Sequence, residues 1–278
     1  MNFFKPENLS ELFEIIRSLK GKYYLLAGGT DINVQIKHRM IPPHADIVYI
    51  DHLKDLQGIE ESDEKIVLGA LTTFQDLLSA KLVKSYLPLL ADNLQNFASP
   101  LLQSTATIGG NIANGSPTAD IMPLLLVLEA NLTLVSAAGE RSLPLQDFFS
   151  GYKKNALKNG EIIKAIEISK DAQENCKTFY QKVGARKTLT IAKVSLAALL
   201  VSDKSKISKI RLAAGSLNEY ARRLPLTEKF LAGKSVENID KKELKKVIQK
   251  EVTPISDLRS DSDYRLNVFL NLVERAIS

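Results

Sequence analysis

Residues 107–120 read TIGGNIANGSPTAD, a stretch in which glycine and small polar residues outnumber all others. Glycine has no Cβ in front of the neighbouring amide groups and accepts positive φ angles, so backbone rich in glycine can lie against a bound group. Hydroxyl and amide side chains add hydrogen bonds to such a group. The stretch therefore predicts a ligand-binding loop, although Gly115 and Pro117 also fit ordinary turn formers.

A second glycine turn lies near the start of the chain. Residues 23–27, YYLLA, read as a short strand that runs directly into Gly28, Gly29, Thr30 and Asp31. Two adjacent glycines allow several backbone N–H groups to point at one anion, which is the geometry of a pyrophosphate site. The spacing is not that of the G-x-G-x-x-G dinucleotide fingerprint, and a plain β-turn fits the residues as well.

The hydrophobic periodicity predicts an α+β chain. Apolar residues at helical spacing predict helices at 9–19, 86–97, 121–130, 225–232, 240–251 and 263–277, the first stopped by Gly21. Apolar and aromatic runs predict strands at 23–27, 45–51, 65–73, 177–185, 193–202 and 207–214, with a helix cap at Thr72 or Thr73. The polar run KDAQENC, 170–176, marks the expected boundary between two domains.

Composition and charge exclude several classes of protein. The 278 residues contain no run near the ~20 apolar residues of a membrane span and no leader-like start, so a cytoplasmic protein is expected. The single Cys176 excludes an iron–sulfur cluster held by this chain alone, and His38, His44 and His52 match no metal-ligand spacing. The net charge is +5, but basic residues are densest in KKELKKVIQKE, 241–251, on the outer face of a predicted helix. No nucleic-acid partner is therefore expected.

Five stretches, in chain order, resemble the flavin-binding subunit of the molybdenum hydroxylases. They are LLAGGTDINVQIK, TIGGNIANGSPTADIMPLLLVLEA, FFSGYKKNALKNGEIIKAIEI, KVGARKTLTIAKVSLAA and RLAAGSLNEYARRLPLTEKFLAGKSV. That family includes the medium subunits of carbon monoxide dehydrogenase and of bacterial xanthine dehydrogenases. The resemblance covers nearly the whole chain. It implies a PCMH-type (vanillyl-alcohol-oxidase-like) FAD-binding domain of two subdomains at 1–172. It also implies a CO dehydrogenase flavoprotein-like C-terminal α+β domain with a small antiparallel sheet at 173–278.

The resemblance further implies which residues hold FAD. The first glycine loop would hold the pyrophosphate through its amides and comprises Leu26, Ala27, Gly28, Gly29, Thr30 and Asp31. The second would contact the diphosphate and the flavin side of the cofactor and comprises Thr107, Ile108, Gly109, Gly110 and Asn111. The remaining matches are Asp120 for the adenosine portion, Phe97 as an aromatic against the cofactor, and Ile163 and Lys182 near the isoalloxazine.

Three of these positions also fit purely structural roles. Asp120 fits the N-cap of the helix that begins at Ile121, Phe97 fits the core, and Lys182 fits a solvent-facing position on a half-buried strand. The two glycine loops agree with a cofactor that carries two phosphates. Their backbone N–H groups can bind phosphate without the free-energy cost of burying a lysine.

The resemblance implies a chain that carries electrons. In this family the substrate is hydroxylated at a molybdenum cofactor on a large subunit, electrons cross iron–sulfur clusters on a small subunit, and FAD passes them to NAD⁺ or another acceptor. Those two subunits are the expected partners. No nucleophile–base constellation is visible, so no catalytic side chain is expected. Two alternatives stay open: an independent FAD-dependent oxidoreductase on the same cofactor fold, and a cofactor-free assembly protein.

Overall fold

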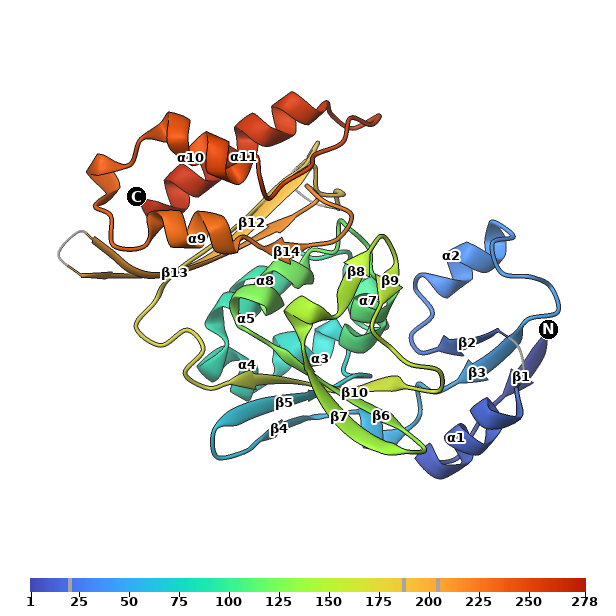
Figure 1. The fold of residues 1–278 in the computed structure, drawn as a ribbon. Helices are drawn as coiled ribbons and strands as arrows, with labels where there is room; N and C mark the ends of the chain where they lie inside the picture. Colours follow the sequence, from blue (N-terminus) through green and yellow to red (C-terminus); the bar gives the residue numbers. More distant parts are fainter. Residues whose placement is uncertain (20–21, 187–188, 204–205) are drawn as a thin grey trace.

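The computed structural model describes residues 1–19, 22–186, 189–203 and 206–278, and the chain passes in turn through three sheets with their helices (Figure 1). The arrangement is α+β, as the hydrophobic periodicity predicts. The expected helix stop at Gly21 lies outside the described residues. Within the described part of the chain, no helix has the length and apolar composition needed to cross a bilayer.

The first sheet is parallel, with strand order β1-β3-β2. Its elements are β1 (Asn2–Phe4), α1 (Leu9–Ser18), β2 (Tyr23–Leu26), α2 (Ile32–Lys37) and β3 (Asp46–Tyr49). Helix α1 begins where the Asn8 side chain accepts from the Glu11 N–H, and it buries Leu12 and Ile16. The first glycine loop therefore follows the carboxyl end of a parallel strand, where open α/β sheets commonly place their ligands.

The second sheet is antiparallel, with order β4-β5-β10-β6-β7. Its strands are β4 (Ile59–Glu61), β5 (Lys65–Gly69), β6 (Asn131–Ser136), β7 (Gly139–Pro144) and β10 (Ile162–Ser169). Between β5 and β6 lie α3 (Phe74–Ser79), α4 (Lys81–Tyr86), α5 (Pro88–Leu94), α6 (Pro100–Gln103), α7 (Ile108–Asn114) and α8 (Ile121–Val127). Short pieces complete this part: η1 (Lys54–Leu56), η2 (Leu145–Asp147), and the ribbon of β8 (Phe149–Gly151) with β9 (Lys154–Asn155). Thr73 is the N-cap of α3 and forms a capping box with Asp76, which confirms the predicted cap.

The helix expected over 86–97 is α5, which spans only Pro88–Leu94. Helix α4 ends at Tyr86 and α5 begins at Pro88, with Leu87 between them at φ −128° and ψ 50°. A residue that precedes proline is disfavoured in the α region, and proline has no N–H for a continuing helix. The apolar stripe is nevertheless buried as predicted, since Leu90 and Leu94 have no exposed surface.

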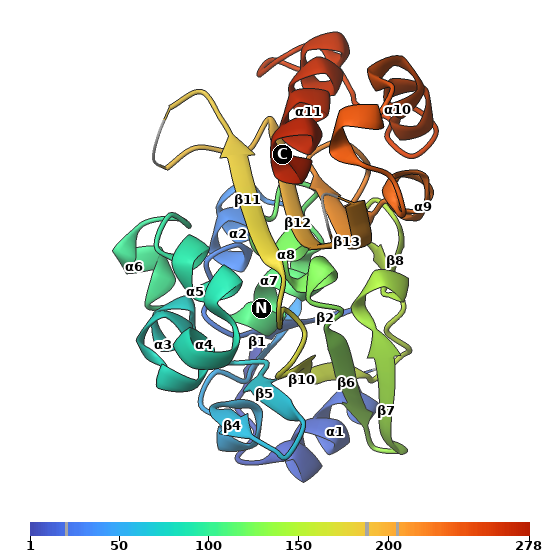
Figure 2. The same cartoon turned by 90° about the vertical axis from the view of Figure 1, so that its left-hand side faces the viewer.

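The C-terminal sheet is antiparallel and is covered on both faces (Figure 2). Its strands are β11 (Lys177–Val183), β12 (Val194–Asp203), β13 (Lys206–Gly215) and β14 (Arg222–Arg223), and its helices are α9 (Pro225–Leu231), η3 (Val236–Asn238), α10 (Lys241–Ile248) and α11 (Ser262–Ile277). Leu196 and Ala198 pack with the terminal helices, whereas Ala197 and Leu199 pack in the same buried cluster as α8. This alternation explains why β12 reads as one continuous apolar run.

Candidate functional site

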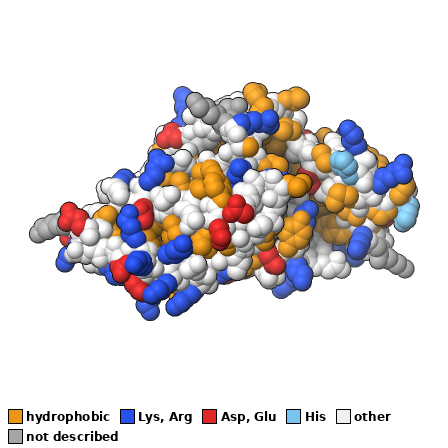
Figure 3. Space-filling view, turned by 90° about the horizontal axis from the view of Figure 1, so that it is seen from above, with side chains coloured by type: hydrophobic (Ala, Val, Ile, Leu, Met, Phe, Trp, Pro, Cys, Tyr) orange, Lys and Arg blue, Asp and Glu red, His pale blue; other side chains and the backbone are white. Residues whose placement is uncertain are grey.

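A cavity of about 420 Å³ lies where the first sheet meets α7 and β10. Figure 1 places α7 beside α2 and β2, and Figure 3 looks onto the notch between the lobe that carries the histidines and the rest of the molecule. The lining comprises Leu25, Ala27, Gly28, Gly29, Thr30, Asp31, Ile32, Gln35, Ile50, Leu56, Ala70, Leu71, Ala106, Thr107, Gly109, Gly110, Asn111, Ala113, Asn114, Lys153, Leu157, Ile162 and Ile163. Both glycine loops, eighty residues apart in the chain, thus border one cavity.

The first glycine loop offers free backbone donors to this cavity. The N–H groups of Gly28, Gly29, Thr30 and Asp31 donate to no acceptor among the described residues. Gly29 has φ +70°, a conformation that turns consecutive amides toward one side of the chain. The Gln35 side chain donates to the Asp31 carboxylate and so holds it against α2. A row of unpaired amides at the edge of a cavity is an anion-binding arrangement.

The second glycine loop is built differently. Three amides around its first turn already have acceptors within the protein: Ile108 N–H on Thr72 O (3.0 Å), Gly109 N–H on Ala70 O (2.8 Å) and Gly110 N–H on Thr107 Oγ1 (3.2 Å). These amides are therefore not the donors that glycine content alone indicates. What the segment presents instead is the Thr107 hydroxyl and the Asn111 side chain, whose Oδ1 is buried without a partner.

The glycines also let each loop pack closely against neighbouring backbone. A Cβ on Gly28 would lie 1.6 Å from Thr105 O, and one on Gly109 would lie 2.6 Å from the Ala70 Cβ. Gly115 ends α7 at φ +61°, which accords with its role as a turn former. Gly28 and Gly109 are thus required for close packing within the protein, independently of any bound cofactor.

Asp120 and Lys182 lie together but outside the cavity lining. Their Oδ2 and Nζ atoms are 2.5 Å apart, and the side chains are 17% and 11% exposed, so Lys182 does not project into solvent. Asp120 precedes α8 but makes no side-chain capping bond. Its backbone O accepts from the Tyr180 hydroxyl at 3.1 Å, and its Oδ1 is buried without a partner. Burial raises the pKa of the Asp120 carboxyl, and the Lys182 ammonium opposes that rise.

The other sequence-predicted residues divide into two groups. Ile163 lines the cavity from β10, next to a register shift in that strand. Leu26, Phe97 and Ile108 do not line it. Phe97 is 5% exposed and packs between Phe74 and Tyr180, with ring centroids 6.4 and 6.1 Å away, as a core aromatic does.

Sequence reasoning missed several lining residues, among them Gln35, Asn114 and Lys153. Asn114 stands three residues after Asn111 and so shares a helix face with it, a signal that the spacing could have revealed. Lys153 sits in the turn between β8 and β9 at φ +52°, and only the folded ribbon brings it to the cavity. The charged lining residues in the described part of the chain are Lys153 and Asp31.

The residues present fit a large dinucleotide cofactor. Four unpaired amides suit a pyrophosphate, and the partnerless Oδ1 of Asn111, which lines the cavity, suits the hydroxyl and N–H groups of a nucleotide. Part of the cavity lining is apolar, with Leu25, Leu56 and Ile162, as a flat ring system requires.

Comparisons with known proteins match this chain over nearly its whole length. A model of the FAD binding domain in molybdopterin dehydrogenase matches residues 1–170, and a model of the CO dehydrogenase flavoprotein C-terminal domain matches residues 179–278. The glyceraldehyde dehydrogenase medium chain of Sulfolobus acidocaldarius is 30% identical over 275 residues, which cover 99% of this chain and 96% of that one. The carbon monoxide dehydrogenase medium chain of Hydrogenophaga pseudoflava is 30% identical over 276 residues, which cover 98% and 94%.

A solved structure extends the likeness to three dimensions. It is the Hydrogenophaga pseudoflava carbon monoxide dehydrogenase that lacks the Mo-pyranopterin moiety of its cofactor, with a TM-score of 0.91 and 28% identity. The match covers 100% of this chain and 96% of that one. The xanthine dehydrogenase FAD-binding subunit of Escherichia coli O157:H7 is a further relative, 29% identical over 255 residues, or 91% and 87% of the two chains.

Proposed function

The chain belongs to the family of FAD-binding subunits of molybdopterin dehydrogenases, and from this premise we propose that it is the electron-transfer chain of a multi-subunit molybdenum hydroxylase. As a member it is an oxidoreductase subunit whose cofactor is FAD. The observation that carries the proposal is the row of four unpaired amides, Gly28 to Asp31, at the edge of the cavity.

The proposed binding roles follow from the donors and acceptors. The amides of Gly28–Asp31 hold the pyrophosphate, and the Thr107 hydroxyl and Asn111 amide approach it from α7. Asp120 accepts from ribose hydroxyls through its partnerless Oδ1, and the Lys182 ammonium favours the ionised form of that carboxylate. Ile163 borders the flavin ring with its backbone.

The other proposed contacts are indirect or come from the same loops. Leu26 and Ala27 place the first loop at the end of β2, and Ile108 anchors α7 in the core, where it has no exposed surface. Phe97 supports Tyr180 behind Asp120. These residues position the groups that touch the cofactor.

FAD, when bound, supplies the chemistry that couples single-electron donors to a hydride acceptor. The residues of this chain bind it, orient it and limit the access of water. We propose that an iron–sulfur small subunit and a molybdenum-cofactor large subunit are its partners in the cytoplasm, and that NAD⁺ is the terminal acceptor, in an enzyme of the xanthine dehydrogenase kind. The relatives are named for glyceraldehyde, carbon monoxide and xanthine, so we assign the choice of substrate to the large subunit.

We also propose a domain boundary between residues 172 and 173. Ala172 lies in the turns that separate β10 from β11, and the matched family models leave residues 171–178 between them. The boundary divides the chain in sequence but does not divide the packing, because one buried cluster contains residues from both sides of it.

The proposal is tested by a spectrum and a reoxidation experiment. The purified chain should show the absorption bands of oxidised flavin and release FAD on denaturation. After anaerobic reduction with dithionite, NAD⁺ should restore those bands. Restoration by ferricyanide but not by NAD⁺ would contradict the acceptor, and a colourless chain that takes up no added FAD would contradict the cofactor site.

A further inference from the structure

Helix α8 is fastened to the C-terminal sheet at both ends. At its N-terminus, Asp120 contacts Lys182 and Tyr180 of β11. In its middle, Pro123 lies so close to β13 that a Cβ on Gly215 would come within 3.0 Å of the Pro123 Cγ. All seven residues of the helix are buried, and its length is only about 10 Å at 1.5 Å per residue. A shift at one end is therefore transmitted to the other.

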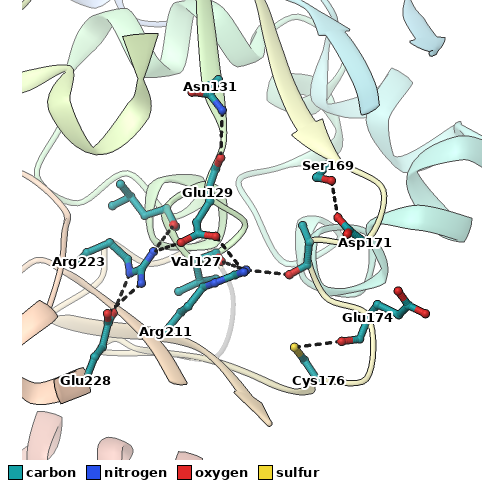
Figure 4. Close-up of polar contacts among 12 residues, drawn as sticks. Val127, Glu129, Asn131, Ser169, Asp171, Glu174, Cys176, Arg211, Arg223 and Glu228 are labelled. Carbon is teal, nitrogen blue, oxygen red and sulfur yellow. Dashed lines mark hydrogen bonds and ion pairs between the residues drawn. The ribbon is translucent and has the colours of Figure 1, made fainter. Parts of the chain in front are cut away.

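At the C-terminal end of α8, the contacts with the sheet are made by two arginines (Figure 4). Arg211 of β13 is 9% exposed and donates to Val127 O at 3.1 Å and to Ala172 O at 2.8 Å. Arg223 of β14 donates to Leu126 O at 3.4 Å. Cations at the last carbonyls of a helix interact favourably with its dipole, so the arginines suit this end of α8.

Glu129 joins the two arginines. Its carboxylate oxygens lie 2.8 Å from Arg211 and 3.3 Å from Arg223, between the two guanidinium groups (Figure 4). Arg223 is held in turn by a two-point ion pair with Glu228 of α9, with contacts of 2.7 and 2.9 Å. The cluster therefore ties the end of α8 to both β13 and α9.

The backbone at Glu129 indicates that its side chain matters. The N–H groups of Glu129 and Ala130 donate to Leu126 O (3.1 Å) and Leu125 O (3.0 Å), which is the Schellman pattern of a helix end. The residue in the left-handed position of that motif is usually glycine, but here Glu129 occupies it at φ +53°. A glutamate at this angle is strained, and the ion pairs of its carboxylate with Arg211 and Arg223 give that carboxylate a role.

We propose that Arg211 and Glu129 are positioning residues of the flavin site. By locking the C-terminal end of α8 to the sheet, they hold Asp120 at the other end in register with Lys182, where its free Oδ1 meets the cofactor. The C-terminal domain thereby takes part in FAD binding through a contact at the far end of α8. This inference rests on the assignment of Asp120 to FAD in the proposed function.

The test is a double-mutant cycle on the full chain, read as the FAD Kd from titration of the apoprotein. Arg211→Met should raise the Kd roughly 2- to 30-fold, the range of coupling through a packed element, and Arg211→Lys should recover part of the loss. In the Asp120→Asn background, Arg211→Met should have little further effect, because both changes remove the same contact. Glu129→Gly relieves the backbone strain but deletes the carboxylate, so it should raise the FAD Kd as Arg211→Met does. It replaces Arg211→Met in the cycle if Arg211→Met fails to fold.

The matched control is Thr227→Val in α9. Thr227 is fully buried and bonds Glu251 at 2.7 Å within the C-terminal domain, so its loss should lower thermal stability and leave the FAD Kd unchanged. Additive effects of Arg211→Met and Asp120→Asn, or an equal Kd rise in Thr227→Val, would overturn the inference alone. A wild-type Kd in Asp120→Asn would instead contradict the assignment of Asp120 and remove the premise.

Discussion

Gly28 is the residue at which the first glycine loop touches Thr105, two residues before the second glycine loop. Its missing side chain leaves room for Thr105 O, and the same residue contributes an unpaired N–H to the cavity. Packing therefore requires glycine at this position, and the backbone N–H of the same residue is available for binding. Gly29 differs, because its requirement is conformational and comes from φ +70°.

Replacing Gly28 by alanine should separate these loops. The new Cβ would lie 1.6 Å from a backbone oxygen that cannot rotate away, so both loops must move. We expect a loss of about 1–3 kcal/mol in the free energy of unfolding, as for other overpacked sites, and loss of bound FAD. Denaturant titration and the flavin-to-protein absorbance ratio measure the two effects.

Gly151→Ala is the control for that substitution. Its Cβ would meet nothing closer than the Glu219 carboxylate at 3.4 Å, which is ordinary contact, so stability and FAD content should stay near wild type. Wild-type stability and FAD content in Gly28→Ala would show that the loops do not need their close approach.

At the scale of elements, an ion pair supports the start of β10 beside the cavity. Arg141 of β7 makes two contacts of 2.8 Å with Glu161 and donates to Ala156 O. Ile162 and Ile163, which follow Glu161 directly, line the cavity. The pair thus fixes the strand that carries the proposed flavin contact.

This pair predicts part of the acid sensitivity of the fold. The hydrogen bonds from Arg141 lower the pKa of Glu161 from 4.5 to about 2. A depressed carboxyl pKa stabilises the folded state above the unfolded value, and that stability is lost as pH falls from 4.5 toward 2. Glu161→Gln should therefore be less stable at pH 7 and should lose less stability on acidification. Unfolding midpoints across that pH range, compared with those of Lys241→Gln, whose partner Glu274 lies in an exposed pair, would check this. Parallel pH profiles for wild type and Glu161→Gln would contradict it.

At the scale of the whole molecule, one buried cluster extends across the two family domains. Ala197, Leu199 and Ala213 of the C-terminal sheet belong to the same buried cluster as α8 and β10. The matched family models and the carbon monoxide dehydrogenase structure confirm the PCMH-type fold and the flavoprotein C-terminal domain expected from sequence. The two domains follow one another in the sequence, but their side chains pack together in the structure.

The isolated segment 1–172 should not behave as an independent flavoprotein. Removing the sheet exposes the apolar face of α8 and leaves Asp120 without Lys182. We expect the fragment to bind a hydrophobic dye, to associate, and to retain no FAD under conditions in which the full chain does. A monomeric fragment that holds FAD stoichiometrically would contradict a shared core.

The sequence by itself determined the family, the two glycine loops and the elements with strong periodicity, because these depend on residues close together in the chain. Periodicity placed β11 to β13 and α9 to α11 correctly, but it did not identify β6, β7 and β10. It also started the helix at 86–97 too early, because Pro88 begins α5. Which amides stay free, and that Asp120 pairs with Lys182 sixty-two residues later, were decided only by the tertiary structure. The same holds for Arg211 and Glu129. Pairings across such separations depend on how sheets and helices dock, and no local pattern in the sequence records that docking.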